Sequence, residues 1–439
     1  MRQYNTANSV LTTDKLNGRS LIFFLTKLFY NKKQTKTIQM TSFTASNTKA
    51  EAVQTNTNMS SSSTNEPNQK KRSSSIIRWS MVKHNQADTG LYDRMNLMIA
   101  AADTADSEQK KKAPASVPLI DISSFTATET TEEEKAKCVN EILSACMNVG
   151  FFKIAGHGVP EEIINNFAVQ SRRFFEQPAQ IKELAADPED SSHGYYAKEN
   201  LNAALGREGA PDIREGYAIG PSEDCDFFEN LWPPTKSCGD GFQMSAKSYY
   251  NEMEKLEAAL SLILTRALKK HTGADLPDDW IQKGMGRHRG LLRPNYYPPS
   301  SGNIAGHTDW STFTILHASG PGLEVVQEEE WRQVPYDPAE KSFVINCGDI
   351  LERWSNGAFK SSIHRVNRSS VPANGQPEDT KPRISFAYFA AEIVDSTDHS
   401  VVQPIIKQNE KRVFEEDLSI LDYMTRNFEG LTLRKHGKK

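Results

Sequence analysis

After residue 289 the sequence breaks into short segments of strand character, each bounded by a turn signal. The candidate strands are 291–297, 312–316, 323–327, 342–346, 361–366 and 383–389. Pro298-Pro299, Gly320-Pro-Gly322 and Asn356-Gly357 are among the turns. Several short strands at close spacing are typical of a sandwich or barrel, so we predict a compact β core at about 289–392.

The residues before this core favour helices. Thr130 and Glu133 form a capping-box signal before a helix that ends near Gly150. Further helices are predicted at about 160–175 and 244–271, with strands at 117–122 and 151–155. A last helix is expected between 410 and 428. We therefore predict an α+β unit over 113–439, with a helical N-terminal part (113–288) and a C-terminal helical segment (393–439).

Residues 1–112 differ in character from the rest of the chain. They carry 17 Lys/Arg against 8 Asp/Glu, are rich in Ser, Thr and Asn, and show no sustained periodicity. We expect a disordered, basic leader that catalysis does not need, with weak local helices around 21–30 and 92–102. Organelle targeting, an unstructured tail, and a true start at Met40 or Met81 are all open for this segment.

Composition excludes several classes of protein. The net charge is −4, so no global basic excess points to nucleic acid. No apolar stretch is long enough to span a membrane. The five cysteines are odd in number and lack Cys-x-x-Cys spacing, which argues against a disulfide framework or thiolate zinc site and favours a reducing, cytoplasmic setting. We expect a monomer acting on a small molecule.

His307, Asp309 and His364 form the pattern with the clearest chemistry. In an extended segment, residues i and i+2 point to one face, so His307 and Asp309 can address one point. His364 lies in a later candidate strand that a barrel can bring alongside. Two histidines and one carboxylate form the facial triad of non-haem iron(II) oxygenases, which leaves coordination positions open.

Arg383 and Ser385 open the last candidate strand and share one face of it. A guanidinium can hold a carboxylate through two hydrogen bonds, and the hydroxyl can add a third. The pair is therefore a candidate seat for one end of a dicarboxylate. Arg365, which flanks His364, should point to the opposite face and is expected to be structural.

Over residues 115–392 the chain resembles the isopenicillin-N-synthase-like group of 2-oxoglutarate- and iron(II)-dependent dioxygenases. The motifs occur in the family's order: Val117-Pro-Leu-Ile-Asp121, Gly150-Phe-Phe-Lys-Ile-Ala-Gly-His-Gly158, Asp212-Ile-Arg-Glu-Gly216, Asn295-Tyr-Tyr-Pro-Pro299, His307-Thr-Asp309, Asn346-Cys-Gly-Asp-Ile-Leu-Glu352, Trp354-Ser-Asn-Gly357, Lys360-Ser-Ser-Ile-His-Arg-Val366 and Arg383-Ile-Ser385.

The resemblance implies a distorted double-stranded β-helix, a jelly-roll barrel flanked by helices. It implies iron(II) on His307, Asp309 and His364, with 2-oxoglutarate anchored by Arg383 and Ser385. Asn295 and Tyr297 match the family's Asn-x-Tyr element, whose Tyr can bond the cosubstrate. It also implies O₂ as oxidant, ascorbate as an optional reductant, and oxidative decarboxylation to succinate and CO₂ coupled to hydroxylation, desaturation or ring closure of a small organic molecule.

Three other functions are alternatives to this interpretation. A relative of the same fold can oxidise its substrate with iron and O₂ without 2-oxoglutarate, and Arg383 and Ser385 would then hold a substrate carboxylate. A non-catalytic ligand-binding relative would not need open metal positions. A zinc hydrolase would need a general-base Glu on a metal-binding helix, and the sequence has no such motif.

Overall fold

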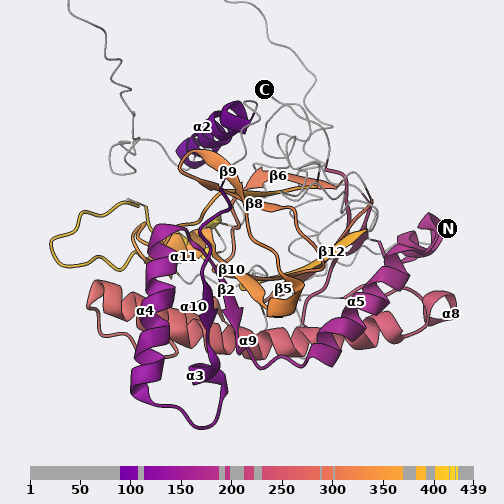
Figure 1. The fold of residues 1–439 in the computed structure, drawn as a ribbon, viewed down its shortest axis with the longest axis horizontal. Helices are drawn as coiled ribbons and strands as arrows, with labels where there is room; N and C mark the ends of the chain where they lie inside the picture. The colour runs from indigo at the N-terminus through magenta and orange to yellow at the C-terminus, as the bar shows by residue number, and fades with distance from the viewer. Residues whose placement is uncertain are drawn as a thin grey trace, which may run out of the picture. The chain divides into compact units, whose positions relative to one another are not determined.

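The computed structural model of the chain describes residues 89–106, 113–186, 193–197, 212–221, 230–286, 289–299, 302–368, 382–391, 401–414, 416–420 and 422–423. Its centre is a pair of β-sheets, with helices on the outer side of the larger sheet (Figure 1). All of the predicted site residues lie on these two sheets or on loops joined to them.

The larger sheet has eight strands in the order β1-β2-β10-β7-β12-β5-β4-β3. β1 pairs with β2 in parallel, and the other neighbours in the sheet are antiparallel. The strands are β1 (Leu119–Asp121), β2 (Phe151–Ala155), β3 (Gly194–Tyr196), β4 (Glu215–Ala218), β5 (Leu291–Tyr297), β7 (Phe313–Ala318), β10 (Phe343–Cys347) and β12 (Arg383–Phe389). β1 and β2 confirm the strands predicted at 117–122 and 151–155, whereas β3 and β4 were not predicted and lie in the part expected to be mainly helical.

The smaller sheet is antiparallel and has the order β6-β11-β8-β9. Its strands are β6 (Asn303–His307), β8 (Leu323–Gln327), β9 (Glu330–Gln333) and β11 (His364–Asn367). Apolar side chains of both sheets pack together between them: Phe151, Leu316 and Val344 from the larger sheet meet Leu323 and Val325 from the smaller one. The two sheets and their flanking helices confirm the predicted α+β jelly-roll fold.

Helices cover the outer face of the larger sheet because every second strand residue there is apolar. Phe313, Ile315, Ile345, Ile384 and Phe386 join one core with α4 (Glu132–Asn148), α5 (Glu161–Phe175) and α9 (Gly241–Thr272). Short helical elements complete the order: α3 (Ser123–Thr126), α6 (Ala179–Lys182), η2 (Glu183–Ala185), α8 (Thr235–Cys238), α10 (Trp280–Met285), η3 (Pro338–Glu340) and α11 (Asp349–Trp354).

The start of α4 lies one residue beyond its predicted position. The capping box is made by Thr131 and Glu134: the Thr131 hydroxyl accepts from the Glu134 N–H, and the Glu134 carboxylate accepts from the Thr131 N–H. Thr130 and Glu133 have the same spacing, so the sequence signal was present in two registers. The acidic first turn also favours this helix terminus.

The expectation of disorder up to residue 112 is wrong for α2 (Thr89–Asp106), whereas the weak helix predicted around 92–102 is confirmed. Met95, Ile99 and Ala102 of α2 are buried against Trp331 and Ile363 of the smaller sheet and its approach loop. In Figure 1, α2 lies next to β9, on the side away from α9. The predicted helix at 21–30 lies outside the described residues.

The C-terminal helical segment is also corrected in part. The described residues include a two-stranded sheet of β13 (Val401–Val402) and β14 (Leu418–Ser419), in which Val402 pairs with Leu418. Both side chains are buried in the main core, which explains why this stretch is extended and not helical. Residues 424–439 lie outside the described part. Across the described residues, we find no helix with the length and apolar character that crossing a membrane requires.

Candidate metal and cosubstrate site

The structure brings His307, Asp309 and His364 together at one end of the smaller sheet. His307 is the last residue of β6, His364 is the first residue of β11, and the two are register partners. Asp309 follows two residues after β6 ends. Its Oδ1 lies 3.6 Å from Nε2 of His307 and 3.5 Å from Nε2 of His364. One ligand atom from each residue falls within 4.8 Å of the others, which suits a single metal ion.

Backbone carbonyls orient both imidazoles. Nδ1 of His307 lies 2.8 Å from the carbonyl of Ala305, and Nδ1 of His364 lies 3.1 Å from that of Ser362. Because a carbonyl can only accept, each Nδ1 carries the proton and each Nε2 is directed at Asp309. A metal-binding imidazole needs this arrangement, with an unprotonated nitrogen toward the ion.

The electrostatics of the three groups favour a cation between them. Burial and the neighbouring charge of His364 lower the pKa of His307 to about 3. Burial opposes ionisation of Asp309, but the charge and hydrogen bond of His364 outweigh it and hold the Asp309 pKa below its usual range. Burial likewise disfavours protonated His364, yet the Asp309 charge raises its pKa. The carboxylate is thus ionised and ready to bind a cation.

The predicted cosubstrate residues form two facing pairs on adjacent strands. In the register of β12 with β5, Arg383 lies opposite Tyr297 and Ser385 lies opposite Asn295. Ile384 and Phe386 belong to the core under the helices, so Arg383 and Ser385 face the inside of the barrel. All four of these polar residues are buried.

Arg383 is a buried cation on the inner face of β12. Its Nε donates to the carbonyl of Gly320 at 3.1 Å, and its guanidinium lies 5.0 Å from the ring centre of Tyr297. Its Nη1 has no hydrogen-bond partner within the described part of the chain. Burial lowers the pKa of Arg383 because the charged form is desolvated. A carboxylate would satisfy Nη1 and offset that cost, so these residues fit the far end of 2-oxoglutarate.

Asn295 is already engaged by neighbouring side chains. Its Oδ1 accepts from Nη1 of Arg214, and its Nδ2 donates to the carbonyl of Arg293. Nη1 of Arg214 also donates to the hydroxyl of Tyr196 at 3.1 Å. The sequence interpretation missed Arg214 and Tyr196 as neighbours of this site, although the Asp212-Ile-Arg-Glu-Gly216 motif contained the arginine.

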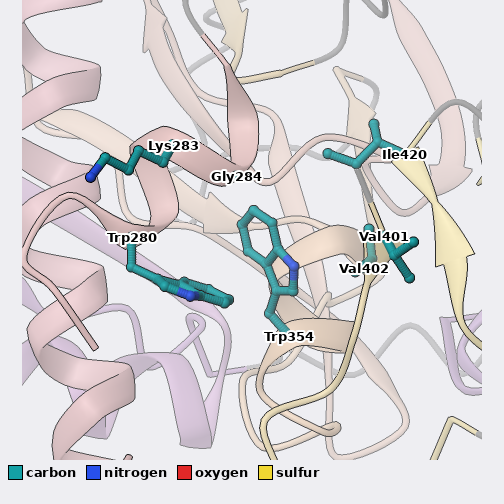
Figure 2. Close-up of a pocket in the computed structure, with 7 residues that line it drawn as sticks. All are labelled: Trp280, Lys283, Gly284, Trp354, Val401, Val402 and Ile420. Carbon is teal, nitrogen blue, oxygen red and sulfur yellow. The ribbon is translucent and has the colours of Figure 1, made fainter. Parts of the chain in front are cut away.

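Arg365, His157 and His317 have structural partners. Arg365 points outward, as predicted, and binds Glu324 at 2.6 Å. His157 contacts the carbonyl of Lys341, and His317 stacks on Phe386, so both are packing residues. Figure 2 shows a pocket of about 290 Å³ that none of the predicted site residues lines; it is bounded by Trp280, Lys283, Gly284, Trp354, Val401, Val402 and Ile420.

A jelly-roll barrel with two histidines, one carboxylate and an inward arginine defines the class of non-haem iron oxygenases. Two family models match the chain. One, described as "non-haem dioxygenase in morphine synthesis N-terminal", matches residues 117–235, and the other, the "2OG-Fe(II) oxygenase superfamily", matches 289–392. The chain belongs to the 2-oxoglutarate- and iron(II)-dependent dioxygenases, enzymes that catalyse hydroxylation or related oxidations with iron(II), 2-oxoglutarate and O₂.

Individual relatives agree with this assignment. The chain is 28% identical to "Proline hydroxylase buaE" of Petromyces alliaceus over 306 residues, which is 65% of this chain and 90% of the relative. It is 27% identical to "Protein DMR6-LIKE OXYGENASE 1" of Arabidopsis thaliana, over 63% of this chain and 77% of the relative. Among solved structures, a full-length Neurospora crassa protein in complex with alpha-KG has the same fold, with a TM-score of 0.59, 24% identity, and coverage of 73% of this chain and 98% of that one.

Proposed function

We propose that His307, Asp309 and His364 hold the iron(II) of this dioxygenase, and that Arg383 anchors 2-oxoglutarate for the oxidation of a small organic substrate. The observation that carries the proposal is the convergence of three ligand atoms within 4.8 Å. When bound, the iron supplies the redox chemistry that couples O₂ to 2-oxoglutarate decarboxylation and substrate oxidation. The residues of the chain bind and orient the reactants around it.

The division of roles follows from the surroundings of each side chain. The two Nε2 atoms and Asp309 Oδ1 are directed at one point, so they are the proposed ligand atoms. Nη1 of Arg383 is the proposed donor to the far carboxylate of 2-oxoglutarate, and the proposed seat includes Ser385 on the same face of β12 and Tyr297 opposite Arg383 on β5. Asn295 supports this seat indirectly, through its bonds with Arg214 and Arg293. Asp309, His364 and the four cosubstrate residues are buried, which limits the access of water to the reacting groups, whereas His307 is half-buried.

An anaerobic titration tests the proposal against an oxidase that does not use 2-oxoglutarate. Adding 2-oxoglutarate to the iron(II)-loaded protein should produce a visible charge-transfer band, and succinate should form in proportion to oxidised substrate under air. Asp309→Ala should bind no iron and show no band. A substrate-dependent O₂ uptake without the band or succinate would favour the oxidase. Iron binding and a normal band in Asp309→Ala would refute the metal assignment.

The wider description of the protein follows from the sequence. We infer one catalytic unit that includes α2 and extends through the C-terminal sheet, acting as a monomer in a reducing, cytoplasmic compartment. The named relatives include a proline hydroxylase and a "Flavonol synthase/flavanone 3-hydroxylase" of Eustoma exaltatum subsp. russellianum. A panel of amino acids, phenolics and nucleobases, read by succinate release, would select the substrate class; sedimentation velocity would test the monomer.

A further inference from the structure

The two oxygens of Asp309 have different surroundings. Oδ2 accepts hydrogen bonds from Oγ1 of Thr314 at 2.5 Å and from Nδ2 of Asn346 at 2.7 Å. Oδ1 instead faces the two imidazoles, 3.6 Å from His307 Nε2 and 3.5 Å from His364 Nε2. A carboxylate oxygen has two lone pairs to share with donors. The two donors on Oδ2 therefore occupy both of its lone pairs.

The position of the two donors, Thr314 and Asn346, follows from the strand register of the larger sheet. Thr314 of β7 and Asn346 of β10 are directly paired across the ladder. Their sequence neighbours Phe313, Ile315 and Ile345 pack under the helices, so both polar side chains project into the barrel. Both are almost completely buried, with 3% and 2% of their surface exposed. The Ser311 hydroxyl lies 3.3 Å from the Thr314 hydroxyl and fixes its orientation further.

We propose that Thr314 and Asn346 are positioning residues that restrict Asp309 to one-oxygen ligation of the iron. The inference rests on the proposed function, because it takes His307, Asp309 and His364 as the metal ligands. Oδ1 alone is left to face the ion, since Oδ2 is held by two donors. Both donors come from the rigid centre of the larger sheet, which prevents the carboxylate from rotating.

This restriction matters because the coordination positions are limited. His307, Asp309 and His364 would supply three ligand atoms to the iron, and such a facial triad would leave three positions open to 2-oxoglutarate and O₂. A carboxylate bound through both oxygens would take one of these three. Without its donors, Asp309 would compete with the cosubstrate for the metal, while the protein would still bind the metal itself.

The Thr314→Val variant tests the proposal, because valine keeps the shape of threonine and lacks the hydroxyl. Thr314→Ser retains the hydroxyl. Thr312→Val is a matched control: Thr312 is equally buried, two residues away, and its Oγ1 has no partner among the described residues. Calorimetric titration with Co(II), followed by titration of the Co(II) form with 2-oxoglutarate, gives both affinities without turnover.

We expect Thr314→Val to weaken 2-oxoglutarate binding by about 10-fold, the equivalent of one hydrogen bond to a charged group, and to leave the Co(II) affinity within about threefold of the wild type. Thr314→Ser and Thr312→Val should match the wild type. If Thr314→Val does not fold, Asn346→Leu should show the same result, which is weaker 2-oxoglutarate binding with a nearly unchanged Co(II) affinity. Equal losses of both affinities, or a Thr314→Val variant that matches Thr312→Val, would overturn the inference.

Asp309→Ala in the same titrations separates this inference from the proposed function. Loss of Co(II) binding in Asp309→Ala together with normal behaviour of Thr314→Val refutes the positioning role alone. Unchanged Co(II) binding in Asp309→Ala refutes the metal site and with it the positioning role.

Discussion

Removal of α2 should destabilise the catalytic unit, although the sequence alone suggested that the whole leader is dispensable. The comparison is between a chain that starts at residue 84, which keeps α2, and one that starts at residue 113, which lacks it. Met95 and Ile99 are 6% and 8% exposed, and they cover Trp331 and Ile363. Deleting the helix would uncover this part of the smaller sheet.

The expected magnitude follows from these contacts. Burial of a Met or Ile side chain contributes about 1.5–3 kcal/mol. Arg365 would lose Asp103 at 3.0 Å and Asp106 at 2.7 Å, but both carboxylates are well exposed, so these pairs add at most about 1 kcal/mol. Taking the lower end of the burial range for both Met95 and Ile99, we expect a net loss of about 3 kcal/mol. For a unit the size of residues 113–439, an unfolding entropy of about 2.1 cal/mol/K per residue makes this a fall in melting temperature of about 4 °C.

Thermal unfolding followed by circular dichroism on the metal-free proteins measures the effect. Ile99→Ala and Leu97→Ala in the longer chain are matched variants on one helix, because Ile99 is buried and Leu97 is 70% exposed. Ile99→Ala should lower the melting temperature, and Leu97→Ala should not. Identical melting of the two truncated chains would refute the docking of α2 on the sheet.

Three other predictions concern the site and the core. Arg383→Met should raise the KM for 2-oxoglutarate by about 30-fold or more, because one partner of a buried charged pair is lost. The KM of Arg383→Lys should lie between those of the wild type and Arg383→Met. Equal KM values for the three proteins in initial-rate assays would contradict this prediction. Chelation of iron by EDTA should abolish succinate formation, and iron(II) but not zinc(II) should restore it. Burial raises the pKa of Glu257 to about 7 despite its hydrogen bond with Tyr388. A carboxyl group whose pKa is higher in the folded than in the unfolded protein destabilises the fold as the pH rises from about 4.5 to about 7. The free energy of unfolding of the wild type should therefore fall by up to about 3 kcal/mol relative to Glu257→Gln across that range. Urea unfolding curves of both proteins at pH 5 and 8 measure the difference.

The strands that the sequence predicted best are those whose side chains meet strongly apolar surroundings. Residues 291–297, 323–327 and 383–389 coincide with β5, β8 and β12. β6 and β9 were missed. β6 contains Ala305 and Gly306, and β9 is mostly polar, so neither has local strand character. Both are strands because β11 and β8 pair with them, which local patterns do not reveal.

The site likewise contains residues that the local sequence reveals and residues that only long-range strand pairing brings together. The three proposed ligands and Arg383 could be singled out from the sequence because their chemical types and order are rare. Thr314 and Asn346 could not, because threonine and asparagine are common and only the β7–β10 register brings them to Asp309. The contact of α2 with the smaller sheet could not be predicted from the sequence either. The carboxylate of Asp103 in α2 accepts a hydrogen bond from the Trp331 N–H, and the two residues are 228 positions apart.

The proposed metal ligands draw on both sheets. The histidines belong to the smaller sheet, whereas the carboxylate is hydrogen-bonded to strands of the larger one. A bound ion would therefore cross-link the two sheets where β6 ends and β11 begins. Metal loading should consequently raise the free energy of unfolding, by about 2.7 kcal/mol when the free ion is at 100 times its Kd, and the metal-free enzyme should be the form most exposed to proteolysis at that end. Iron supply would then set the lifetime of the protein as well as the rate of its reaction.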